Sequence, residues 1–367
     1  MREDLLYWIS LSKIKSLSRT KIRNIIQIFP NMKEFWFSDV TTLKDTGILT
    51  SEDINSICLA RENIEPEKEL EEIKKRKINV ITIYDSEYPQ LLKEIYDPPF
   101  LLYCKGNLEV LKNKSISIVG TRNCTNYGKE VTRHLAHDLS SIGITIVSGL
   151  ALGIDTAAHI GALIPKNGTT IAVLGSGIDF IYPRQNRNLY EEISQRGLII
   201  SEYPPDTKPE VWRFPARNRI ISGLSYGVIV VEASEKSGAL ITADYALDQG
   251  REVFAVPGQI NREQSKGVHN LIRQGATLIT CVSDVFQELG WFIPELLDDN
   301  KEKVNSCIKD LTKEEQQVYL LLNSDPKHID FITSNIELSS EKVNSILMLL
   351  EIKGLITQLD GKRFIRK

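Results

Sequence analysis

This sequence has few of the features that mark secreted or membrane proteins. Its five cysteines are scattered and form no Cys-x-x-Cys pair, which predicts reduced thiols and no disulfide framework. The first residues lack the apolar core of a signal peptide, and no apolar run approaches the length of a membrane span. We therefore expect a cytoplasmic protein that makes no membrane contact.

A strong overall charge is also missing. The 45 lysines and arginines nearly balance the 48 aspartates and glutamates, so the net charge is −3 and does not itself indicate nucleic-acid binding. Any basic binding surface must therefore be a local patch. His134 and His137 are one helical turn apart, but the carboxylates near them lie on the same exposed stretch, which favours a solvated face over a metal site. We expect neither a metal nor a cofactor.

What the sequence does contain is a repeated alternation of strand and helix patterns. A length of 367 residues with 42% hydrophobic residues predicts a globular protein of two or three domains. Continuously apolar segments predict buried strands, and helical patterns fill the gaps between them, so we expect a parallel sheet covered on both faces. These segments are 116–119, 144–147, 170–174, 198–201, 228–231, 253–256 and 277–279, with an extension of the sheet at 78–84 and 98–106.

The two ends of the chain carry different patterns. Residues 1–77 predict a small domain of short helices. Its hairpin segment 13–20 has no glycine, so DNA contact and a packing role are both open. Residues 293–305 are charged and pattern-poor, which predicts a linker. Residues 306–367 begin with a capping box at Thr312 and end in a hairpin about Gly361, which predicts a winged-helix domain. The predicted fold class is thus α/β, with a parallel sheet core over 78–292.

Glycine- and arginine-rich turns follow the predicted strands. In open α/β sheets, the turns after the carboxyl ends of the strands form the binding crevice, and helix N-termini there attract phosphate. Gly120 allows close backbone approach in the first turn, and Arg122 brings a five-donor fork that suits a phosphate oxygen. The alternative for Arg122 is a salt bridge. Gly149 and Gly153 flank the helix entry of the second turn.

The helix after the second turn contains a possible acid–base pair. Asp155 and His159 lie four residues apart on one helical face. The favoured interpretation is that Asp155 complements the helix dipole or holds the loop, and that His159 packs beneath it. The segment Gly175-Ser-Gly177 has no third glycine, so a dinucleotide-binding fingerprint is missing.

The segment 214–219, Phe-Pro-Ala-Arg-Asn-Arg, is the most informative turn. Phe214 offers a stacking face, and Arg217, Asn218 and Arg219 offer charge and an amide, which are the groups that proteins use on single-stranded nucleic acid. Arg213 and Lys208 add positive charge. The alternative is a buried Phe214 with the arginines in ion pairs.

A further helix start follows another predicted strand. Ser237 and Gly238 open a helix that continues through Thr242, with Lys236 beside it, and free N–H groups there suit another phosphate. Several phosphate-type turns with arginines, but no obvious nucleophile, predict a binder of polyanions before a catalyst.

The ordered blocks resemble the DNA-processing protein A family, also called DprA or Smf. The resemblance runs from Tyr88 to about Ala276 and rests on blocks at 119–122, 148–155, 171–179, 182–183, 201–204, 214–225, 232–233, 237–243 and 256–258. It implies an extended Rossmann-like domain over 78–292 that binds single-stranded DNA, forms a homodimer, protects incoming single strands during natural transformation and loads the RecA recombinase onto them. The two ends match the family only in architecture, as a helical domain of the sterile-alpha-motif type over 1–77 and a winged helix over 306–367.

The resemblance also implies roles for individual residues. Arg122 would hold a phosphate, Phe214 and the run 217–219 would line the DNA pocket, and Arg184 and Arg213 would form a basic rim. The helix starts at Gly149, Gly153 and Gly238 would supply backbone donors. The sequence departs from the family in the block 267–272, where Gly-Val-His-Asn-Leu-Ile stands in place of a Gly-x-Asn-x-Leu-Ile pattern.

The alternative function comes from an enzyme class with a related fold. Nucleoside monophosphate phosphoribohydrolases carry a Pro-Gly-Gly-x-Gly-Thr-x-x-Glu turn, in which the glutamate assists cleavage. The comparable turn here, residues 237–244, has neither the glycine pair nor the glutamate at that spacing. We therefore expect a protein without catalytic residues.

Overall fold

A computed structural model of the chain describes residues 4–292, 311–323, 326–336, 338–353, 355–359 and 361–366. The chain forms two compact units, Met1–Phe292 and the residues that follow. The predicted linker at 293–305 lies outside the described residues. Among the helices that the structure describes, none is both long enough and apolar enough to span a membrane.

A nine-stranded sheet organises the first unit, in the order β1-β2-β6-β5-β4-β3-β7-β8-β9. Strands β3 to β9 are parallel, whereas β1 and β2 join the edge of the sheet in antiparallel pairing. This arrangement confirms the predicted parallel sheet and its extension. The strands are β1 (Asn79–Thr82), β2 (Leu101–Gly106), β3 (Ser115–Val119), β4 (Thr145–Ser148), β5 (Thr170–Leu174), β6 (Leu198–Ser201), β7 (Gly227–Val230), β8 (Glu252–Ala255) and β9 (Thr277–Leu278).

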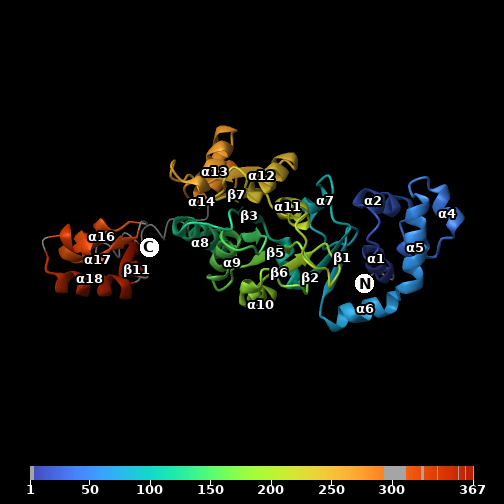
Figure 1. Ribbon diagram of the computed structural model, residues 1–367, viewed down its shortest axis with the longest axis horizontal. Coiled ribbons are helices and arrows are strands. Elements are labelled where there is room, and N and C mark those ends of the chain that lie inside the picture. The colour runs from blue at the N-terminus through green and yellow to red at the C-terminus, as the bar shows by residue number, and fades with distance from the viewer. Residues whose placement is uncertain are drawn as a thin grey trace. The chain divides into compact units, whose positions relative to one another are not determined.

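Helices cover both faces of this sheet (Figure 1). One face packs against α8 (Asn126–Ser141), α9 (Ile154–Leu163) and α10 (Arg187–Arg196). The other face packs against α7 (Gln90–Lys93), α11 (Arg213–Gly223), α12 (Gly238–Asp248) and α13 (Glu263–Arg273). Two short 3₁₀ helices, η1 (Leu108–Lys112) and η2 (Arg184–Asn186), and the helix α14 (Val282–Glu288) complete the connections.

The two faces follow from the alternation of side chains along each strand. In β5, Ala172 and Leu174 belong to one apolar cluster, and Ile171 and Val173 belong to the other. Both sets are buried because helices lie on both faces, which explains why these strands are continuously apolar in the sequence.

The N-terminal helices pack onto the edge of the sheet and share its core. They are α1 (Leu5–Ser12), α2 (Arg19–Ile28), α3 (Met32–Phe37), α4 (Val40–Asp45), α5 (Ser51–Asn63) and α6 (Pro66–Lys75). Trp8 is fully buried in one apolar cluster with Tyr103 of β2 and Ile199 of β6. The helical region therefore belongs to the same compact unit as the sheet, and a domain boundary at residue 77 stays a prediction.

The second unit is small and has its own apolar core. It contains α16 (Lys313–Leu321), β10 (Lys327–His328), α17 (Ile329–Ser334), α18 (Ser340–Ile352), β11 (Ile356–Leu359) and β12 (Arg363–Arg366). The predicted capping box is present, since the Thr312 hydroxyl accepts from Glu315 N and the Glu315 carboxylate accepts from Thr312 N. The three helices and the three-stranded sheet that the structure describes in this unit, with the β11–β12 hairpin, have the arrangement of a winged helix.

A buried ion pair ties α11 to the turn after β6. The Arg219 guanidinium donates to both carboxylate oxygens of Glu202, at 3.0 and 2.7 Å, and also to Asp97. Both side chains of the first pair are buried, with 4% and 9% exposed. Arg19 of α2 contacts Asp97 at 3.0 Å and so connects the helical region to the same network.

We expect Glu202→Ala to lower the free energy of unfolding by about 3 kcal/mol, because it leaves a buried guanidinium with one partner fewer. Urea unfolding of the full chain measures the effect. Glu192→Ala is the matched control, since Glu192 pairs with Arg196 at the surface and its loss should cost less than about 1 kcal/mol. Equal losses of unfolding free energy in the two variants would show that the buried Glu202 pair contributes no more than a surface ion pair.

Candidate nucleic-acid interface

A crevice of about 450 Å³ lies at the carboxyl edge of the sheet. The strand order reverses at β3, whose neighbours are β4 and β7, and the turns after β3 and β7 face each other there. The lining residues come from these turns, from the turns after β4, β5 and β6, and from α9, α11 and α12. They are Val119, Gly120, Thr121, Arg122, Asn123, Ala151, Asp155, Tyr182, Val211, Phe214, Pro215, Arg217, Asn218, Ile221, Ser234, Ser237, Gly238, Ala239 and Thr242.

An aromatic and cationic stack forms one wall of the crevice. The guanidinium carbon of Arg122 lies 5.6 Å from the centre of the Phe214 ring, and the Tyr182 ring centre lies 5.6 Å from the same ring. Gly175 makes room for Phe214, because a Cβ at that position would lie 2.9 Å from the ring. Arg122 is exposed and has no carboxylate partner among the described residues. The structure thus brings Arg122 and Phe214 together from different turns.

A second guanidinium lies below the crevice. Arg217 is buried and donates to the carbonyl oxygen of Gly149 at 2.9 Å and to that of Val173. Burial, with a smaller contribution from the Arg122 charge, lowers the pKa of Arg217 to about 10, and the nearby Asp155 carboxylate opposes this shift. Arg217 therefore joins the turn after β4 and strand β5 to α11 and adds positive charge to the crevice floor.

The third wall is the start of α12. The Ser237 hydroxyl accepts from Ala239 N at 3.3 Å, and Gly238 is exposed, with no Cβ contact to limit approach. The Asn218 amide donates to the Gly238 carbonyl at 3.2 Å and so connects α11 to this turn. Thr242 is buried one turn further along and lines the crevice from below.

The start of α8, in contrast, is already closed by a carboxylate. Glu232 accepts from Thr125 N at 2.8 Å and from Thr125 Oγ1 at 2.6 Å. The Thr125 hydroxyl in turn accepts from Gly128 N. A carboxylate therefore lies at this helix entrance, which makes it less favourable for a phosphate group than the start of α12. Gly120 serves mainly the packing, because a Cβ there would lie 2.5 Å from the Ile154 side chain.

Several predicted residues do not line the crevice. The Gly149 amide donates to Asp155 at 3.2 Å, and a Cβ at Gly149 would lie 2.6 Å from the Arg217 guanidinium. Gly153 has a positive φ of 84° and packs against the backbone of Thr121 and Arg122. The two glycines thus support the crevice from outside it.

The remaining predicted cations do not line the crevice. Arg219 is in the buried ion pair with Glu202, as the alternative interpretation of that segment expected. Arg184 is exposed on η2, and Lys236 is exposed next to the start of α12. Arg213 is mostly buried against Tyr203 and Trp212 and pairs with Glu210.

Asp155 and His159 have separate partners and do not form an acid–base pair. The Asp155 carboxylate accepts from the amides of Gly149 and Ala151, and burial raises its pKa. His159 is fully buried, and its Nδ1 lies 2.7 Å from the Thr170 hydroxyl. Burial, with a smaller contribution from the Arg217 charge, lowers the pKa of His159 to about 3.

Sequence reasoning from the motifs did not identify Tyr182, Val211 or Ser234 as crevice residues. Tyr182 follows the turn after β5 and precedes a cis proline, and the aromatic–proline pair was the only available signal. Val211 and Ser234 carry no charge and belong to no recognisable motif. Among the described residues, no group of three or more potential ligands could hold a metal ion.

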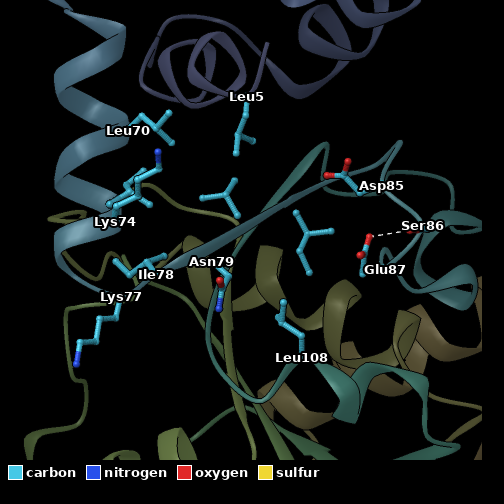
Figure 2. A pocket seen from close by; sticks show the side chains of 13 residues that line it. Leu5, Leu70, Lys74, Lys77, Ile78, Asn79, Asp85, Ser86, Glu87 and Leu108 are labelled. Atoms are coloured by element: carbon cyan, nitrogen blue, oxygen red, sulfur yellow. Dashed lines mark hydrogen bonds between the residues drawn. The ribbon is translucent and has the colours of Figure 1, made fainter. Parts of the chain in front are cut away.

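A larger cavity, of about 870 Å³, lies elsewhere, between α6 and the edge strand β1 (Figure 2). Figure 2 shows Leu70 and Lys74 on the α6 side and Asp85 and Glu87 on the opposite side. The Asp85 carboxylate accepts from Thr82 N at 2.7 Å, and Asp85 N donates to Thr82 O, so part of the free edge of β1 is already satisfied. The charged residues of its lining, Lys74, Lys77, Asp85 and Glu87, carry both signs, so this cavity offers less to a polyanion than the crevice does.

Family models, related sequences and solved structures all give the same match for this chain. The model of a family described as DNA recombination-mediator protein A matches residues 79–290, and a model described as DprA winged helix domain matches residues 307–362. Protein Smf of Synechocystis is 36% identical over 394 aligned residues, which cover 98% of each chain. These matches confirm the resemblance that the ordered sequence blocks predicted.

Solved structures agree with these matches. The X-ray structure of DNA processing protein A from Streptococcus pneumoniae has a TM-score of 0.70 and 38% identity, covering 79% of this chain and 99% of that one. DNA processing protein A from Helicobacter pylori, whose structure describes a single-stranded DNA binding mode, has a TM-score of 0.53 and 35% identity. It covers 58% of this chain and 95% of its own.

Because the buried imidazole of His159 is neutral, we expect the stability of the protein to depend on pH. The unfolded chain takes up a proton at His159 near pH 6.5, whereas the folded chain does so only near pH 3, so stability falls as the pH drops through this window. We expect this residue to contribute a loss of about 1.4 kcal/mol per pH unit between pH about 6 and 4. Urea unfolding of the parent and of His159→Gln should therefore give a shallower pH slope in the variant.

His134→Gln is the control for this prediction, because His134 is exposed. Its pH slope should equal that of the parent. A His159→Gln variant with the parent's slope would show that the imidazole is not held neutral.

Proposed function

The chain belongs to the DNA recombination-mediator protein A family, and on that premise we propose that it binds single-stranded DNA in the crevice at the carboxyl edge of its sheet. The strand is held by stacking and by phosphate contacts, without readout of base identity. The single-stranded DNA binding mode described for the Helicobacter pylori relative supports this proposal.

The observation that carries the proposal is the environment of Arg122. Its guanidinium is exposed, stacks on Phe214 and is free of carboxylate partners among the described residues. Most other arginines nearby are engaged, as Arg213 is with Glu210 and Arg219 with Glu202. An unpaired guanidinium beside an aromatic face suits a nucleotide, because the phosphate and the base can be bound together.

Other predicted residues support the same site. Ser237 and Gly238 place the positive end of the α12 dipole at the crevice, where it favours a phosphate group. Exposed Lys236 and Arg184 add cations at the periphery. Gly149, Gly153 and Arg219 act indirectly, by holding the turns and α11 in place.

A binding role accounts for the crevice better than hydrolysis does. Asp155 is its one lining carboxyl group, and this group is engaged by two backbone amides and lies near Arg217. A phosphoribohydrolase needs a free carboxylate beside the phosphate-binding turn, and the residues around Ser237 supply none in the lining. We therefore propose that the protein is not an enzyme.

The proposal extends to the partners that the family implies. We propose that the chain forms a homodimer, protects incoming single strands and loads the RecA recombinase onto them. Light scattering tests the dimer, and RecA-dependent strand exchange tests the loading.

The first test compares single strands with duplexes. We expect tighter binding to oligothymidylate and to mixed-sequence single strands than to a duplex of the same length, because the crevice needs unstacked bases. Affinity should fall steeply with salt, since each phosphate contact releases counterions. Fluorescence anisotropy over a salt titration measures both effects, and equal or tighter duplex binding would contradict the proposal.

The second test separates charge from stacking. Arg122→Ala should weaken binding to all sequences and reduce the salt slope by about one unit, because it removes one phosphate contact. Phe214→Ala should cost about 1–3 kcal/mol and leave the salt slope nearly unchanged. Lys166→Ala is the charge control, because Lys166 is exposed between α9 and β5, at the opposite edge of the sheet. If both crevice variants bind like the parent, the DNA site lies elsewhere.

A further inference from the structure

A second group of aromatic side chains lies beside the crevice, where α11 begins. Trp212 precedes the helix, and its side chain is 56% exposed. The guanidinium carbon of Arg213 lies 4.9 Å from the Trp212 ring centre and 5.2 Å from the Tyr203 ring centre. The two rings are thus arranged around one cation, with Trp212 on the outside.

Hydrogen bonds hold this group in a fixed arrangement. The Trp212 indole donates from Nε1 to Glu210 at 2.5 Å. Arg213 pairs with the same carboxylate at 3.1 Å and donates to the Lys208 carbonyl. The Trp212 ring is therefore oriented before any ligand arrives, which reduces the entropy lost on binding.

Packing does not account for a tryptophan at this position. Trp8 and Trp36 are 0% and 4% exposed and fill the core of the helical region, whereas Trp212 leaves more than half of its surface to solvent. Its side chain also makes no capping hydrogen bond to α11. A large aromatic side chain that contributes little to the core is available to bind a ligand.

The ring lies next to the crevice along the chain. Val211 lines the crevice and Phe214 forms its aromatic wall, so Trp212 is one residue from the first and two from the second. Consecutive Cα atoms are about 3.8 Å apart, which is less than the spacing of neighbouring nucleotides in an extended strand. A single DNA strand that leaves the crevice past Val211 therefore reaches Trp212 within a nucleotide or two.

We propose that Trp212 is a second stacking platform, which binds a base of the same single strand just outside the crevice. This inference rests on the proposed function and adds a contact that the crevice itself does not contain. Glu210 balances the Arg213 charge, so the platform carries no net positive charge and contacts the base and not the phosphate. Its contribution should be insensitive to salt, unlike that of Arg122.

Intrinsic fluorescence tests the contact directly. The chain has four tryptophans, of which Trp8 and Trp36 are buried, so Trp212 should dominate any quenching by bound DNA. We expect oligothymidylate to quench the fluorescence of the full-length parent and most of this quenching to disappear in Trp212→Phe. Trp291→Phe is the matched control, because Trp291 contacts Tyr226, Phe286 and Lys114 and does not line the crevice. Oligothymidylate should quench the fluorescence of Trp291→Phe as strongly as that of the parent.

Affinity measurements complete the test. Trp212→Ala should weaken binding of a long oligonucleotide by about 5- to 150-fold with an unchanged salt slope, and it should have little effect on a dinucleotide that fills only the crevice. Tyr96→Ala, which removes an aromatic ring that is 86% exposed, should bind like the parent. Circular dichroism verifies that each variant is folded.

The outcomes separate this inference from the function on which it rests. If the parent does not bind single strands, the proposed function and the platform both fail. If the parent binds and Arg122→Ala weakens it, but Trp212→Ala and Trp212→Phe behave like the parent, only the platform is wrong.

Discussion

The buried guanidinium of Arg217 is the interaction on which the crevice depends. It reaches from α11 to the carbonyl groups of Gly149 and Val173, and Asp155 provides the nearby negative charge. Removing a guanidinium from water is costly, and only a full set of partners offsets this cost. Because Gly149 has no Cβ, the guanidinium can approach its backbone closely. Phe214 and Asn218, on the same helix, take their places relative to this anchor.

The three arginines of α11 have different environments, which the sequence motif alone does not reveal. Arg213 lies over two aromatic rings, and Arg219 is paired with Glu202. Arg217 is buried and donates to the backbone carbonyl group of Gly149. In the sequence they form one basic cluster, and all three were predicted to contact DNA. Their environments differ because successive helix positions point in different directions and because Glu202 comes from a distant turn. The cation most accessible in the crevice, Arg122, comes instead from the turn after β3.

The strands of the sheet were predictable from the sequence to within a few residues, because burial on both faces leaves continuous apolar runs. The resemblance to a family predicted the turns that meet at the crevice. What the sequence could not show were contacts between distant segments. The carboxylate of Glu232 accepts a hydrogen bond from Thr125 N at the start of α8, 107 residues away in the sequence. The Tyr182 ring contacts the Phe214 ring, which belongs to a different turn. Neither contact has a local signal, since both depend on how the strands are ordered in the sheet.

The apolar cluster shared by Trp8, Tyr103 and Ile199 makes the N-terminal helices part of the folding of the sheet. A modular protein can gain, lose or exchange a segment when the surface between the segments is small and polar. Here the removal of α1 to α6 would expose the aromatic and aliphatic side chains on one face of β2 and β6 to water. A sheet fragment that starts at residue 78 would therefore present this apolar face to solvent, where it would favour association between copies.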